Sequence, residues 1–219
     1  MKGNSLKPLI LLGAGAFLLL KGFKSVKKPI RSIYLLGDSH TAQPRYRLAD
    51  TKFFDDESTW FRTALEKRVK VPVYVGARGG WGVKKARQHF MPHIKSVNPD
   101  VVVAWLGVND LSSGRSPDHI ISELKKLKED VKPSRLVLLD IMPWGGYSRG
   151  KDKVELTRAT NERIHKEIGV PVMSMARFGD AQGRLKPEFT ADNLHFDRPS
   201  KSAAYEILSD MLVDFLFTL

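Results

Sequence analysis

Two short segments near opposite ends of the chain carry the side chains of a nucleophile and its base. Ser39 follows an apolar run, in Gly37-Asp38-Ser39-His40, and His195 comes three residues after Asp192. A serine hydroxyl is a poor nucleophile at neutral pH unless a base takes its proton during attack. An aspartate three residues before a histidine can accept the Nδ1 proton, which leaves Nε2 facing the serine. The sequence therefore predicts a catalytic set of Ser39, His195 and Asp192.

Acyl transfer also needs N–H donors directed at the oxyanion that develops in the transition state. The backbone N–H of Ser39 is one candidate, and the side-chain amide of Asn109, in Gly107-Val108-Asn109-Asp110, is another. A third is a backbone N–H in the glycine-rich block of residues 76–82, because glycine tolerates unusual dihedral angles and close approach. Within this block, Gly79 and Gly80 are both candidates.

The four segments GDSH, GARGGWG, GVND and DNLH together resemble the SGNH, or GDSL-like, hydrolase superfamily. The serine, glycine, asparagine and histidine that name the superfamily occur here in the same order, and the resemblance spans residues 33 to about 206. The usual Gly-x-Ser-Gly pattern favours Gly79 as the named glycine, although the spacing to Asn109 also allows Gly80. Histidine stands at position 40, where members commonly carry leucine.

The resemblance implies a serine hydrolase that cleaves a carboxylic ester through an acyl-enzyme on Ser39. The implied activities are those of an esterase, a lipase or a carbohydrate or peptidoglycan O-acetylesterase, so the expected substrate is an acetylated glycan or a lipid ester. No cofactor is expected. Two alternatives stay open, namely an O-acyltransferase of the same fold and a non-catalytic structural module of a cell envelope or virion.

Apolar strands alternate with helical patterns in the order that builds a parallel sheet covered by helices. We expect a three-layer α/β/α fold with a mostly parallel, five-stranded, flavodoxin-like sheet over residues 32–219. The expected strands are Ser32–Leu36, Val71–Val75, Asp100–Leu106, Arg135–Asp140 and Val170–Met173. The expected helices are Ser58–Arg68, Val83–Phe90, Pro117–Asp130, Lys153–Ile168 and Pro199–Phe217. Ligands bind at the carboxyl ends of such strands, so the polar segments that follow them should converge on one crevice.

Three further side chains are candidates for contact with the substrate. His40 follows the nucleophile, and Trp81 and Trp144 lie in loops after strands, where core packing is the alternative for both tryptophans. His89 and His93 have the four-residue spacing of two metal ligands on one helix face. Pro92 is expected to interrupt that helix, and no carboxylate completes a site, so no metal site is predicted.

The formal charge of +12 is concentrated at the N-terminus. Residues 1–31 hold seven basic residues and no acidic ones, which leaves 29 basic against 24 acidic residues, a net charge of +5, in the remainder. Basic clusters that flank an apolar run suit anionic lipid headgroups or a secretion signal better than a nucleic acid, and no nucleic-acid binding is expected. The chain has no cysteine, which excludes disulfides and a lipid-modified cysteine anchor.

Residues 1–31 are expected to be a membrane anchor or signal followed by a linker. The apolar run of residues 8–20 is shorter than a full membrane span, and residues 8–23 are the predicted membrane contact. A cleaved export signal, an uncleaved anchor and a membrane-surface helix all fit, and the lysines that follow the run favour the anchor. We expect a membrane-associated protein of the cell envelope, with its orientation left open.

Overall fold

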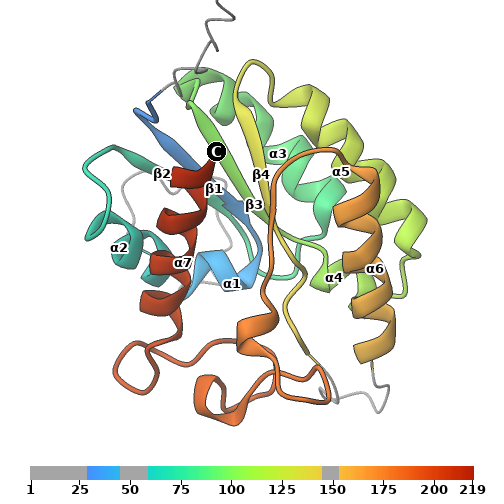
Figure 1. Cartoon of the computed structure of the whole chain (residues 1–219). Helices are drawn as coiled ribbons and strands as arrows, with labels where there is room; N and C mark the ends of the chain where they lie inside the picture. Colours follow the sequence, from blue (N-terminus) through green and yellow to red (C-terminus); the bar gives the residue numbers. More distant parts are fainter. Residues whose placement is uncertain (1–28, 45–58, 145–152) are drawn as a thin grey trace, which may run out of the picture.

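The computed structural model describes residues 29–44, 59–144 and 153–219. Within them, five strands form a single parallel sheet in the order β2-β1-β3-β4-β5 (Figure 1). The strands are β1 (Ile33–Gly37), β2 (Val73–Ala77), β3 (Val101–Trp105), β4 (Arg135–Leu139) and β5 (Val172–Met173). The five predicted strands are confirmed. The sheet is parallel throughout rather than mostly parallel, because a helix-containing crossover separates each strand from the next.

Seven α-helices occur in the described residues. They are α1 (Ser39–Ala42), α2 (Trp60–Glu66), α3 (Val83–Val97), α4 (Val108–Ser112), α5 (Pro117–Asp130), α6 (Val154–Glu167) and α7 (Ala204–Thr218). The short helices α1 and α4 were not predicted. The expected end of α3 at Phe90 was wrong, because the helix continues through Pro92. Proline removes only one helical N–H, and the buried side chains of Phe90 and Ile94 keep both halves of α3 packed on the sheet.

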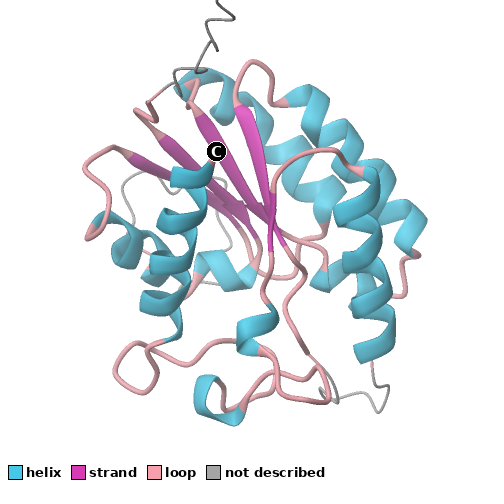
Figure 2. Ribbon diagram, viewed as in Figure 1, coloured by secondary structure: helices cyan, strands magenta, loops and turns pink. Residues whose placement is uncertain are grey.

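Helices cover both faces of the sheet, which gives the expected three layers (Figure 2). Alternate residues of β1 point to opposite faces, as the period of a strand requires. Ile33 and Leu35 pack in a core with α2 and α7, whereas Tyr34 and Leu36 pack in a second core with α3 and α5. Because both faces are buried, β1 and β3 carry no charged residue along their whole length.

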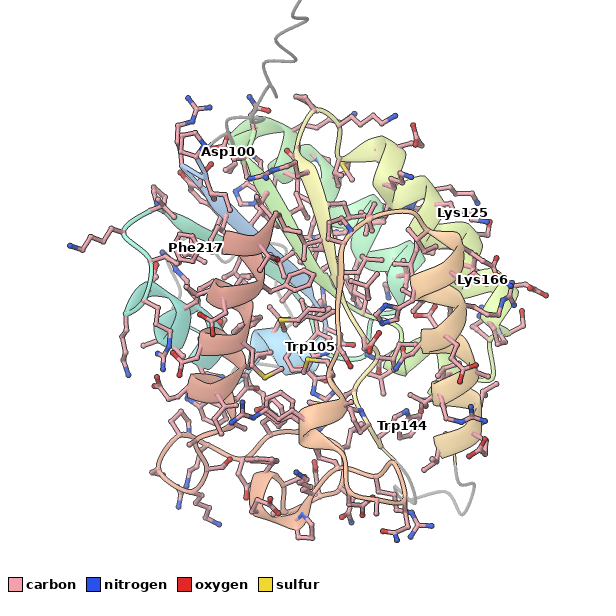
Figure 3. All side chains as sticks on the ribbon, viewed as in Figure 1. Asp100, Trp105, Lys125, Trp144, Lys166 and Phe217 are labelled. Carbon is pink, nitrogen blue, oxygen red and sulfur yellow. The ribbon has the colours of Figure 1, made fainter. Side chains whose placement is uncertain are left out.

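The carboxyl ends of the strands lie together at one end of the molecule, the lower end in Figure 1. Helix α1 begins there directly after β1, and the chain between β5 and α7 crosses the same end. Trp144 lies at this end of the molecule, and Asp100 and Phe217 lie at the opposite end (Figure 3). The topology thus brings residues from near positions 40, 80, 109 and 195 to one edge of the sheet.

At the opposite end of the sheet, where the strands begin, Arg31 leads the chain into β1. Its backbone N–H and its guanidinium donate to the Asp100 carboxylate over 2.6 and 3.0 Å. The predicted membrane segment of residues 8–23 and the rest of the basic N-terminal region up to residue 28 lie outside the described residues. Of the helices in the described ranges, none is long and apolar enough to cross a bilayer.

Candidate active site

A tight turn between β1 and α1 presents Ser39 at the carboxyl edge of the sheet. Asp38 caps α1, with its Oδ1 accepting the His40 backbone N–H over 3.0 Å, and Ser39 is the first residue of the helix. Gly37 has no room for a side chain, since a Cβ there would lie 2.0 Å from Thr41 Oγ1. Glycine is therefore required for the strand to turn so sharply into the helix, and the turn leaves the Ser39 side chain 7% exposed.

The segment from Asp192 to His195 folds into a compact loop around the Asp192 carboxylate. Oδ1 accepts the backbone N–H groups of Leu194 and His195 over 2.9 and 2.7 Å. Asn193 has a φ of 60°, in the left-handed region that asparagine tolerates better than most residues. The second oxygen, Oδ2, lies 2.7 Å from His195 Nδ1. One carboxylate thus fixes both the backbone of the loop and the orientation of the imidazole.

Ser39 and His195, which are 156 residues apart in the sequence, meet with 2.9 Å between Oγ and Nε2. Since Nδ1 directs its proton at Asp192, Nε2 is the nitrogen that can accept the serine proton. Burial raises the pKa of Asp192, but the hydrogen bonds from the His195 ring and from the loop N–H groups outweigh it and hold the pKa below its ordinary value. The carboxylate is therefore ionised at neutral pH and can stabilise an imidazolium.

An aromatic cluster fixes the backbone beside His195. The buried ring of Phe196 lies 5.8 Å from Trp105 and 4.7 Å from Phe178 between centroids, and it meets Tyr205 edge to face at 5.4 Å. Phe196 was not predicted to have a role at the site. In the sequence, it is marked only as an apolar residue next to the candidate base. The cluster ties the histidine loop to β3 and α7, so the imidazole is held by core packing as well as by Asp192.

The Asn109 side chain lies beside the nucleophile turn, on the short helix α4. Gly107 precedes this helix with a φ of 118°, which L side chains rarely adopt. Asn109 Nδ2 donates to Asp38 Oδ2 over 3.1 Å and to the Trp81 carbonyl over 3.2 Å. The amide thus joins three of the four predicted segments, and no sequence pattern signals its contact with Asp38. Burial raises the pKa of Asp38 to about 7.

Both glycine candidates lie in the turn that follows β2. Gly79 is half-buried, and Gly80 is exposed with a φ of 77°. Within the described part of the chain, the backbone N–H groups of Ser39, Gly79 and Gly80 donate no hydrogen bond. None of the three is thus committed to another acceptor there, and the oxyanion hole and the choice between the two glycines stay predictions.

His40 is buried behind the dyad rather than along the crevice. Its ring stacks on Trp105 with centroids 4.9 Å apart and lies 5.1 Å from the His195 ring. Among the described residues, neither of its ring nitrogens has a hydrogen-bond partner. Burial, helped by the nearby His195, lowers the pKa of His40 to about 3, so the ring is neutral at physiological pH. His40 was predicted as a candidate for contact with the substrate. Such a contact would require this buried side chain to become exposed.

The two candidate tryptophans are both buried in the core that contains α3. Trp81 packs edge-on against His89, with centroids 4.8 Å apart, and its carbonyl accepts the Asn109 amide. Trp144 also lines a cleft of about 950 Å³ together with Gly80 and Asn109. Core packing therefore applies to both rings, and Trp144 in addition forms part of the wall of a cleft at the site.

A second cleft, of about 440 Å³, is lined in part by the base and its carboxylate. Its walls include Trp60, Asp192 and His195. The reacting pair therefore has a larger cleft next to Asn109 and a smaller one next to the imidazole.

His89 and His93 lie on a continuous α3, contrary to the expected break at Pro92. His93 Nδ1 lies 2.8 Å from the Tyr34 hydroxyl, and His89 packs on Trp81 and Phe90. Both rings thus have packing or hydrogen-bonding roles. Among residues 29–44, 59–144 and 153–219, no group of three or more histidine, aspartate or glutamate side chains is arranged to hold a metal ion.

Comparison with known proteins gives one family match and many related folds. The model of the GDSL-like lipase/acylhydrolase family matches residues 35–199. A GDSL-like lipase from Bacteroides thetaiotaomicron superimposes with a TM-score of 0.67 at 15% identity, covering 87% of this chain and 89% of that one. No curated protein sequence matches the chain.

Two esterases of known structure have the same fold. A psychrotrophic esterase from Pseudoalteromonas sp. has a TM-score of 0.61 at 17% identity, with 86% of this chain and 97% of that one covered. A variant of an acetyl-xylooligosaccharide esterase from Geobacillus has the same TM-score and identity, with coverages of 85% and 93%. At such low identity these likenesses bear on the fold alone.

Proposed function

Since the chain belongs to the GDSL-like lipase/acylhydrolase family, a family of serine ester hydrolases, we propose that it cleaves a carboxylic ester through an acyl-enzyme on Ser39. The observation that carries this proposal is the hydrogen-bonded series from Ser39 Oγ to His195 Nε2 and from His195 Nδ1 to Asp192, with distances of 2.9 and 2.7 Å. This is the geometry that nucleophilic catalysis by a serine needs.

In the proposed first half-reaction, Ser39 Oγ attacks the ester carbonyl carbon while His195 Nε2 takes the hydroxyl proton. The carbonyl oxygen becomes an oxyanion that accepts hydrogen bonds from the N–H groups of Ser39 and of Gly79 or Gly80. When the tetrahedral intermediate collapses, the bond to the alcohol oxygen breaks and the His195 imidazolium gives its proton to the departing alcohol. The products of this step are the free alcohol and an ester of Ser39.

In the second half-reaction, a water molecule attacks the acyl carbon, and His195 takes one of its protons. The bond to Ser39 Oγ then breaks, and the proton passes from His195 to this oxygen, which releases the carboxylic acid and restores the enzyme. Asp192 keeps the imidazole in the required tautomer throughout and stabilises its charged form. Interception of the acyl-enzyme by a sugar hydroxyl in place of water would make the protein an O-acyltransferase.

Asn109 is proposed as a further oxyanion donor, at the expense of one of its present hydrogen bonds. Both Nδ2 protons have acceptors, in Asp38 and in the Trp81 carbonyl. We expect Asn109→Ala to lower kcat by about 10²- to 10³-fold, as for other single oxyanion donors, with a smaller change in KM. Steady-state kinetics on a chromogenic ester measure both constants. A rise in KM with kcat unchanged would contradict the proposed role and favour a role in shaping the cleft.

The substrate is proposed to be an acetylated glycan or a lipid ester. Hydrolysis of an ester panel that varies acyl-chain length and includes O-acetylated oligosaccharides tests this, with a glycan acceptor added in parallel to detect transfer. We expect acid release from at least one member of the panel. Transfer to the acceptor that exceeds hydrolysis would replace the hydrolase by an acyltransferase. Failure of a fluorophosphonate to label the folded protein would favour a non-catalytic module.

We propose that residues 1–31 are a membrane anchor or signal followed by a linker, and that residues 32–219 are the hydrolase domain. The protein is proposed to be associated with the membrane of a cell envelope. The support is the apolar run of residues 8–20 between lysines. We expect the full chain to sediment with membranes and a chain that lacks residues 1–28 to remain in the supernatant. Equal partition of the two chains would contradict the anchor, and mass spectrometry of the full chain would detect cleavage.

A further inference from the structure

The larger cleft beside the dyad has a strongly cationic lining. It lies between the first turns of α3 and the loop that joins α4 to α5, and it measures about 950 Å³. Helix α3 contributes three side chains to the lining of the cleft, those of Lys84, Lys85 and Gln88. Positions three or four residues apart on a helix share a face. Arg115 contributes from the facing loop and Lys153 from the residue before α6. Four basic side chains from three segments therefore surround one cavity.

None of these four cations forms an ion pair in the described part of the chain, and Arg115 has only a longer-range electrostatic interaction with Asp110. Lys84, Lys85, Arg115 and Lys153 make no ion pair there, whereas many basic residues elsewhere on the surface do, such as Arg163 with Asp118 and Glu167. Lys85 instead places its Nζ 5.1 Å from the centre of the Trp81 ring. Unpaired like charges around a cavity raise the local concentration of anions.

Among the described residues, Asp110 is the only acidic one that lines the cleft, and its carboxylate is already engaged. Oδ2 accepts the Val83 backbone N–H over 2.9 Å, and Oδ1 lies 3.9 Å from His119 Nε2. The side chain is buried. The carboxylate thus links α4 to the start of α3 and offsets little of the charge of the lysines at the cleft mouth.

The orientation of α3 adds to the positive potential. This 15-residue helix begins at the cleft and carries no acidic residue in its first turn. The N-terminal end of a helix bears a partial positive charge, which favours a nearby anion. The cations and the helix end are thus directed at the same space.

The cleft is continuous with the proposed oxyanion hole. Asn109 and Gly80 line it, and the Asn109 amide contacts Asp38, the residue before Ser39. We propose that the ester substrate carries a negatively charged group, a carboxylate or a phosphate, which binds in this cleft among Lys84, Lys85 and Arg115. This inference rests on the proposed hydrolase function and adds the substrate class to it. An acidic glycan and an anionic lipid headgroup share this chemistry.

Matched pairs of esters test the proposal. One pair is 4-acetoxybenzoate and 4-acetoxybenzamide, which differ in one charge on the alcohol side. A second is the mono-4-nitrophenyl ester of adipic acid and its amide, with the charge on the acyl side. 4-Acetoxyphenyl phosphate replaces the carboxylate by a phosphate and so distinguishes the two anions. Rates are divided by the uncatalysed hydrolysis of each ester, since the substituents also change reactivity.

At 0.01 M salt, we expect kcat/KM to be about tenfold higher for the anionic member of at least one pair, mainly because its KM is lower. The factor is modest because each of the two or three cations contributes little binding free energy. The preference should largely vanish at 1 M salt, where the screening length falls from about 30 Å to about 3 Å. Cleavage of both members of every pair at equal normalised rates would overturn the proposal. If those equal rates were lost in Ser39→Ala, the proposed hydrolase function would still hold.

The double variant Lys84→Glu/Lys85→Glu assigns the preference to the cleft. Glutamate in the first turn of α3 is favourable to the helix, so folding should be retained, and thermal unfolding checks this. We expect loss of the preference for anions. The control Lys70→Glu/Lys166→Glu makes the same change in net charge at two exposed residues that line none of the site clefts, and should keep the preference. Persistence of the preference in the cleft variant would overturn the proposal.

A binding measurement separates the inference from catalysis. The amide 4-acetamidobenzoate keeps the charge but resists cleavage, and calorimetry compares its binding with that of 4-acetamidobenzamide. Tighter binding of the anion that depends on Lys84 and Lys85, in a protein that cleaves no ester, would support the cleft and overturn the proposed function. Equal affinity for both amides in such a protein would overturn both.

Discussion

Ser39→Ala is expected to lower ester turnover by several orders of magnitude, up to about a millionfold, because no other group would form the acyl-enzyme. The fold should be unaffected. Alanine fits wherever serine fits, and among the described residues the Ser39 side chain forms a hydrogen bond with His195 alone. Helix α1 keeps its cap, since Asp38 and the His40 N–H are unchanged. The measurement is steady-state hydrolysis of the best ester of the panel, with thermal unfolding to compare stability.

Ser122→Ala is the matched control for this prediction. Ser122 is exposed on α5, and the same oxygen atom is removed there without touching either cleft at the site. The control should keep wild-type turnover and covalent labelling by a fluorophosphonate, whereas Ser39→Ala should lose both. Wild-type turnover by a folded Ser39→Ala protein would rule out the acyl-enzyme on this residue.

His195→Ala should produce a loss of the same order as Ser39→Ala. Without the imidazole, no group of the described residues within hydrogen-bond distance of Ser39 Oγ can take its proton, and Asp192 loses the ring that it orients. The serine hydroxyl then has only its weak intrinsic reactivity. Turnover of the same ester, measured beside wild type under identical conditions, gives the size of the loss.

The double variant Ser39→Ala/His195→Ala makes this prediction specific. Groups that act as one unit are strongly non-additive, so the double variant should be about as slow as either single variant. If the two losses multiplied, Ser39 and His195 would be acting independently, and the proposed proton transfer between them would be wrong. Circular dichroism and thermal unfolding establish that each variant is folded.

Much of the fold was predictable because the buried strands are mostly apolar and are followed by helical patterns. Helix α5 begins at Pro117 after the cap Ser116 and ends at Asp130, as predicted, since both its cap and its apolar spacing are local signals. Helix α3 was predicted too short, because a proline is a local signal for a helix end, whereas packing of Ile94 on the sheet is a tertiary effect. Helices α1 and α4 are too short to show a periodic pattern.

The site was predictable as far as it depends on residue types in local segments. The contact of Asp192 with His195 follows from a three-residue spacing, and the approach of Ser39 follows from the topology of a parallel sheet. The hydrogen bond from Asn109 to Asp38 and the burial of His40 depend on how the loops pack, and no local pattern encodes that. The cationic cleft was missed for the same reason, since its four basic residues come from three separate segments.

The long separation of Ser39 from His195 makes activity a measure of complete folding. The nucleophile follows β1 directly, while its base lies 156 residues later and is held by a cluster that includes Tyr205 of α7. The Tyr205 hydroxyl also donates to the His40 carbonyl over 2.8 Å. A ribosome-bound chain can therefore acquire no esterase activity until the residues up to Tyr205 have emerged. In denaturant, inactivation and global unfolding should fall on a single curve.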